Sequence, residues 1–170
     1  MKRTILPLVA FVCLLFAASK ASAQLKRFSI GPYVEAGFPT GDFSETHKTG
    51  IGAGLTADIK LLAGFTATGS VGYMHFSGKT FETTEGAEAE YANFSAIPVR
   101  VGLKYKLVSV LYAKLEAGSA NFTGDNNGAA FILSPGIGVR LLMFDIQGKY
   151  EAWFKDGTSG FLGLRASLNF

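Results

Sequence analysis

FLGLRASLNF, residues 161–170, is the stretch that decides the fold. Apolar residues occupy every second position from Leu162 to Phe170, and the positions between them include Arg165, Ser167 and Asn169. This alternation indicates a β-strand with one apolar and one polar face. The same period continues upstream and predicts eight strands, at residues 27–40, 50–61, 65–76, 92–105, 108–122, 129–141, 143–154 and 160–170.

Alternation does not say which face lies outside, and a soluble lipocalin-like barrel would turn its apolar face inward. The glycines favour the opposite arrangement, because most of them fall on the polar face. An eight-stranded barrel is just wide enough inside for side chains, so long charged residues need small residues opposite them. The polar face is therefore predicted to line the lumen, and the apolar face to contact lipid.

Two further patterns support this sidedness. Aromatic residues of the apolar face fall at two levels, as the two interfaces of a membrane require. One level holds Phe28, Phe65, Tyr105, Phe144 and Phe170, and the other holds Phe38, Tyr73, Phe131, Tyr150 and Phe154. The connections at 41–49, 77–91, 123–128 and 155–159 are long and polar and alternate with very short ones, which is typical of outer-membrane barrels.

The first 23 residues have the pattern of a cleaved export signal. Lys2 and Arg3 precede an apolar run at 5–17, and Ala21-Ser22-Ala23 is a small-residue cleavage site. We expect residues 24–170 to form one barrel domain. Three of the 16 lysines and arginines lie within the signal, so the rest of the chain is formally neutral and a general affinity for nucleic acid is not expected.

Two segments carry a resemblance to a known family. Residues 30–43, IGPYVEAGFPTGDF, and residues 97–105, IPVRVGLKY, are similar to strands of the small eight-stranded outer-membrane β-barrels, of the OmpA-transmembrane and OmpX type. The resemblance implies an all-β, up-and-down transmembrane barrel in the cell outer membrane. It also implies that Phe170 is the signal read by the barrel-assembly machinery, and that outer-membrane lipid and lipopolysaccharide surround the protein.

The polar face predicts a lumen closed by ion pairs, because an unpaired charge in so confined a space costs several kcal/mol. Arg100, Arg140 and Arg165 are predicted hubs that each contact several acceptors. The predicted network comprises Glu35, Asp58, Lys60, Arg100, Lys104, Lys114, Glu116, Arg140, Asp145, Lys149, Glu151 and Arg165.

The function predicted on this basis is structural or surface-interacting, with no catalysis, cofactor or metal site, and with an external partner that the sequence does not identify. A narrow pore is the first alternative. His75-Phe76-Ser77 supplies a second, because it resembles the His-x-Ser element of outer-membrane lipid A deacylases, although no orienting acid is evident. His47 stands alone, and the acidic segment 77–91 is interpreted as a solvated surface loop.

Overall fold

A computed structural model describes residues 27–82, 88–123, 128–155 and 157–170. The predicted signal at 1–23 and the predicted mature start at Gln24 lie outside these ranges. Within them, no helix has the length and apolar character needed to cross a membrane.

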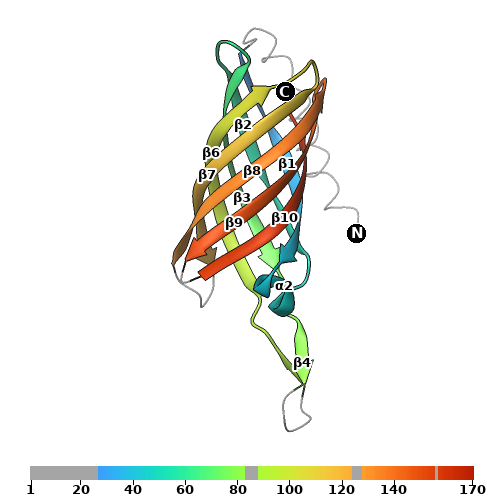
Figure 1. Ribbon diagram of the computed structural model, residues 1–170, viewed down its shortest axis with the longest axis vertical. Coiled ribbons are helices and arrows are strands. Elements are labelled where there is room, and N and C mark those ends of the chain that lie inside the picture. Colours follow the sequence, from blue (N-terminus) through green and yellow to red (C-terminus); the bar gives the residue numbers. More distant parts are fainter. Residues whose placement is uncertain (1–26, 83–87, 124–127, 156) are drawn as a thin grey trace, which may run out of the picture.

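Eight long antiparallel strands close into a barrel, as the sequence predicted (Figure 1). The order around the barrel is β1-β10-β9-β8-β7-β6-β3-β2, so each strand pairs with its neighbour along the chain and β10 returns to β1. The bounds are β1 Phe28–Thr40, β2 Gly50–Lys60, β3 Phe65–Phe76, β6 Phe94–Lys106, β7 Leu111–Thr123, β8 Ala129–Leu141, β9 Phe144–Lys155 and β10 Gly157–Leu168.

The barrel is inside-out relative to a soluble protein. In β9, Phe144, Ile146 and Tyr150 are exposed on the wall, whereas Asp145 and Lys149 between them are buried in the lumen. Val34, Val101 and Ile137 are each more than 60% exposed on other strands. Apolar side chains left uncovered in this number need a hydrocarbon solvent rather than water. The predicted sidedness is therefore confirmed: the apolar face points outward and the polar face lines the lumen.

Glycines make room for the large side chains that cross the lumen. A methyl group added at Gly54 or Gly72 would overlap the Tyr33 ring, and one added at Gly138 would overlap the Tyr112 ring. At Gly148, on the outer wall, an added methyl group would meet nothing within 4 Å. Small residues therefore sit where a bulky neighbour fills the interior, which is the packing expected for a narrow barrel.

One end of the barrel carries short turns and the other carries folded extensions. Residues 61–64, 107–110 and 142–143 form the short-turn end, where Leu142 adopts a positive φ of 56° and is almost fully exposed. At the opposite end, α2 (Asp42–Thr46) and a hairpin of β4 (Thr80–Glu82) and β5 (Glu88–Glu90) extend beyond the strands (Figure 1).

The structure corrects three details of the prediction. The strand expected at 108–122 begins at Leu111, because residues 107–110 form the turn. The segment 77–91 is not a plain loop, since β4 and β5 pair within it and Phe81 packs on Tyr91. The long connection expected at 155–159 does not exist, because β10 begins at Gly157 and pairs at once with Lys155.

Candidate functional site

The strand register places charged residues of the lumen directly across from residues of opposite charge or from glycines. Arg165 of β10 lies directly across from Glu35 of β1, and Asp145 of β9 lies across from Arg140 of β8. Lys149 faces Gly136 on one side and Gly163 on the other. The antiparallel ladder thus brings acids and bases that are far apart in sequence to the same level of the barrel.

A central cluster of seven ionisable side chains lies in the middle of the lumen, and Glu35, with three ion pairs, is its most connected member. Glu35 Oε1 is 2.8 Å from Lys149 Nζ and 3.5 Å from an Arg100 nitrogen, and Glu35 Oε2 is 2.8 Å from Arg165 Nη2. Glu151 Oε1 accepts from Arg100 at 2.6 Å, and its Oε2 accepts from Lys149 at 2.6 Å. The complete cluster is Glu35, Arg100, Lys114, Glu116, Lys149, Glu151 and Arg165.

This cluster contains four bases and three acids, and each side chain is 2% exposed or less. The acids are therefore the scarcer partners, and each must neutralise more than one base. Because carboxylates offer two oxygens with several lone pairs, they can serve as shared acceptors. The arrangement holds opposite charges in contact across the interior of the barrel.

A second group, the mouth cluster, lies towards the short-turn end. Lys104 Nζ donates to Asp58 at 2.8 Å and to Asp145 at 3.1 Å. Arg140 Nη1 donates to the same Asp58 oxygen at 2.9 Å, and the Tyr112 hydroxyl donates to Asp145. Two acids and two bases are thus tied together beneath the opening of the barrel.

A group of aromatic side chains, which we call the aromatic plug, packs together inside the barrel at the loop end. Trp153, Phe76 and Phe161 are at most 2% exposed, and their ring centroids lie 5.3–6.2 Å apart. Phe43 of α2 packs edge-on against Phe76 at 5.0 Å, so the helix covers the plug from outside. Trp153 Nε1 donates to Glu151 at 2.6 Å, which joins the plug to the central cluster.

Ten of the twelve predicted network residues are buried in the lumen, and two differ. Lys60 is exposed at the end of β2 and forms no ion pair with any described residue, because the strand ends there at the open mouth. Arg140 has a side chain that is 24% exposed, and it donates to one acid, Asp58, and to the Ser29 hydroxyl. Arg100 and Arg165 each contact two acids.

The aromatic plug and the two lumen tyrosines, Tyr33 and Tyr112, were not predicted from the sequence. A signal was present, because the inward positions turn apolar near the loop end of several strands. Met74 and Phe76 end β3, and Trp153 lies near the end of β9. Tyr33 packs its ring under the Arg165 guanidinium at 4.2 Å, which adds a cation–π contact to the ion pairs.

The two histidines lie outside this network. His75 Nδ1 is 2.7 Å from Ser95 Oγ and its Nε2 is 3.5 Å from Ser77 Oγ, but no carboxylate of the described residues contacts the ring. A triad needs such an acid to orient the imidazole. His47 packs against Phe43, and burial lowers the pKa of its imidazole. Among the described residues, no three metal-binding side chains gather together.

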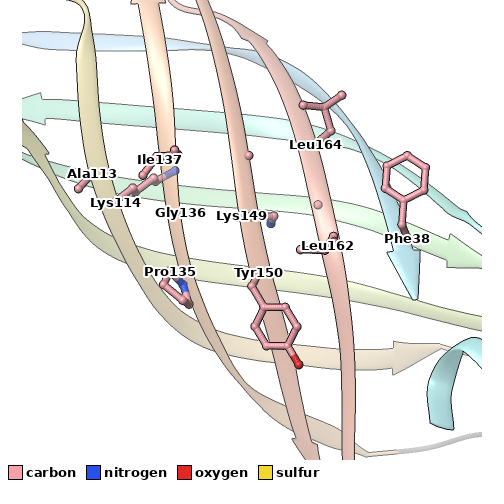
Figure 2. Close-up of a pocket in the computed structure, with 12 residues that line it drawn as sticks. Phe38, Ala113, Lys114, Pro135, Gly136, Ile137, Lys149, Tyr150, Leu162 and Leu164 are labelled. Atoms are coloured by element: carbon pink, nitrogen blue, oxygen red, sulfur yellow. The ribbon is translucent and has the colours of Figure 1, made fainter. Parts of the chain in front are cut away.

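The outer wall of the barrel carries a shallow groove. Its volume is about 700 Å³ and its lining includes Gly148. Phe38, Tyr150, Leu162 and Leu164 border it (Figure 2). These apolar side chains face outward, so the groove belongs to the lipid-facing surface. Nine of the ten predicted girdle residues are exposed and Phe170 is half-buried. Phe65 packs against Tyr105 at 4.8 Å at one level, and Phe131 packs against Phe154 at 6.3 Å at the other.

Two solved structures share this architecture. A designed transmembrane β-barrel is 15% identical to this chain, with a TM-score of 0.56. The alignment covers 84% of this chain and 95% of the designed one. The outer membrane protein Ail of Yersinia pestis, whose structure was determined in a phospholipid bilayer nanodisc, is 15% identical to this chain, with a TM-score of 0.55. The alignment covers 82% of this chain and 99% of Ail. The fold is that of a small transmembrane β-barrel. No protein-family model and no curated protein sequence matches the chain.

Proposed function

We propose that this protein is an integral outer-membrane β-barrel whose lumen is sealed and whose role is structural or surface-interacting. The observation that carries the proposal is the double closure of an inside-out barrel: ion pairs fill the middle, and aromatic rings fill the loop end. A barrel of this kind is anchored by its wall and leaves only its two ends to contact other molecules.

The loop end is the surface we assign to interaction. The hairpin of β4 and β5 projects beyond the barrel (Figure 1). The rings of Phe81 in β4 and of Tyr91, directly after β5, pack at 4.6 Å, and each side chain is about 40% exposed. Exposed aromatic side chains supply large contact areas at interfaces. We further propose export by the signal at 1–23, assembly through the terminal Phe170, and contact of the wall with lipid and lipopolysaccharide.

The sidedness of the barrel is tested by the fluorescence of Trp153, the one tryptophan of the chain. Because Trp153 is buried in the lumen, lipids brominated in their acyl chains should quench it only slightly in reconstituted vesicles. A Phe131→Trp/Trp153→Phe variant moves the fluorophore to the lipid-facing wall and should be quenched strongly. Equal quenching of both proteins would contradict the membrane assignment.

The sealed lumen predicts that the purified protein produces no steady conductance in planar-bilayer recordings. Ion passage would require removal of both the central cluster and the aromatic plug, each of which is packed across the interior. Steady, reproducible single-channel steps from protein that shows the heat-modifiable gel shift of a folded barrel would instead support the narrow-pore alternative.

We propose no catalytic activity. The His75 cluster is the nearest approach to an enzyme site, and it has serine hydroxyls on both ring nitrogens where a triad requires a carboxylate. Unchanged lipid A mass spectra in cells that express the protein would agree with this assignment, whereas deacylation abolished by His75→Ala would overturn it.

A further inference from the structure

The short-turn end of the barrel contains a cavity that is separate from the central cluster and the aromatic plug. It has a volume of about 280 Å³ and is formed by the ends of β2, β3, β6, β7 and β8 and the turns beside them. The side chains that matter for its chemistry are Lys60, Thr66, Lys104, Lys106, Tyr112 and Arg140. The aromatic plug lies at the opposite end, so this cavity opens towards the other side of the membrane.

Four bases line the cavity, and only two of them have acidic partners. Asp58 and Asp145 are occupied by Lys104 and Arg140 in the mouth cluster. Lys60 and Lys106 form no ion pair with any described residue. The central cluster beneath the mouth does not supply the missing charge, because its four bases already exceed its three acids.

Positive charge that is concentrated in a concave, low-dielectric opening raises the local concentration of anions. Lysine ammonium groups recognise phosphate as point charges, and an arginine held by an acid still has N–H groups to donate. The Thr66 and Tyr112 hydroxyls add neutral polar groups to the wall. An anion with more than one charge fits four surrounding bases better than a single carboxylate does.

We propose that this mouth cavity binds a phosphate group, with Lys60 and Lys106 as its charge partners and Arg140 and Thr66 as additional hydrogen-bond donors. The cavity has room for a phosphate with a small substituent. Two sources share this chemistry: a free phosphate-type anion from the aqueous compartment, and the headgroup of an anionic phospholipid in the adjacent leaflet. The proposal goes beyond the structural role above, because it concerns the end of the barrel that the hairpin does not reach.

The first arm of the test is isothermal titration of the purified protein, in zwitterionic detergent at low salt, with inorganic phosphate. We expect saturable binding that Lys60→Gln/Lys106→Gln weakens about tenfold, the effect of losing roughly one weak ion-pair contribution from each lysine. The matched control is Lys48→Gln/Lys79→Gln, which removes two bases at the loop end of the barrel, away from the cavity, and should leave the affinity unchanged.

The second arm identifies the source. Protein in nanodiscs that mix phosphatidylcholine and phosphatidylglycerol is released for native mass spectrometry. Retained phosphatidylglycerol that the lysine double variant loses assigns the site to a lipid headgroup, whereas phosphate binding without lipid retention assigns it to a free anion. Absence of both, or an equal loss in the control variant, would overturn the proposal.

A third measurement needs no substitution, in case the double variant does not fold. Acetylation of lysines in the unaltered protein is followed by mass spectrometry with and without inorganic phosphate. Phosphate should slow the labelling of Lys60 and Lys106 severalfold and leave Lys48 unaffected. The same labelling rates at all three lysines would contradict binding at the mouth.

Discussion

Replacing Glu35 with glutamine is expected to lower the free energy of unfolding by about 3–5 kcal/mol, the cost of breaking a buried charge network. Glu35 neutralises Lys149, Arg165 and, at longer range, Arg100. The central cluster has more bases than acids, so loss of one acid leaves several buried cations short of a partner. Urea titration of the protein in lipid vesicles, followed by Trp153 fluorescence, measures the change.

The charge balance provides the control for this experiment. Adding Lys149→Met to Glu35→Gln removes one of the stranded cations and should recover about 1.5 kcal/mol or more, since the two residues are in contact. Glu45→Gln removes an exposed carboxylate of α2 and should change stability by less than about 0.5 kcal/mol. Similar effects of Glu35→Gln and Glu45→Gln would show that the network contributes little to stability.

The second large effect is expected from Trp153→Ala, which should cost about 3–5 kcal/mol through the cavity that it leaves. Trp153 packs on Phe76 and Phe161 and also donates to Glu151, so the substitution disturbs both the aromatic plug and the central cluster. Because the variant has lost its fluorophore, unfolding is followed by far-ultraviolet circular dichroism and by the fraction that migrates as folded barrel without boiling.

Trp153→Phe separates the two contributions. It keeps most of the ring packing but removes the N–H donor, so a loss of about 1.5–3 kcal/mol is expected from the hydrogen bond to a charged acceptor. Phe81→Ala, at the half-exposed ring pair of the hairpin, should cost less than about 1 kcal/mol. A Trp153→Ala loss no greater than that of Phe81→Ala would show that the plug does not stabilise the barrel.

The strands and their sidedness could be predicted because both follow from period-two alternation. A residue such as Ile146 and its neighbour Asp145 must point to opposite faces of any strand, whatever its partners are. The glycine positions then selected the face that lines a narrow interior. The connections were harder: the absent loop at 155–159 and the hairpin at β4 and β5 depend on how far each ladder continues past the membrane, which alternation does not encode.

The sequence by itself determined the barrel, the lipid-facing wall and the set of charges that point inward. Only the tertiary structure decided which acid meets which base, because the partners of Glu35 come from strands β6, β9 and β10 and depend on register and barrel closure. It also decided that Phe43, Phe76, Trp153 and Phe161 converge into a plug, and that Lys60 stays outside the network. These contacts depend on distances across the lumen. The alternation along one strand fixes the face to which a side chain points, but it does not fix the residue on another strand that the side chain contacts.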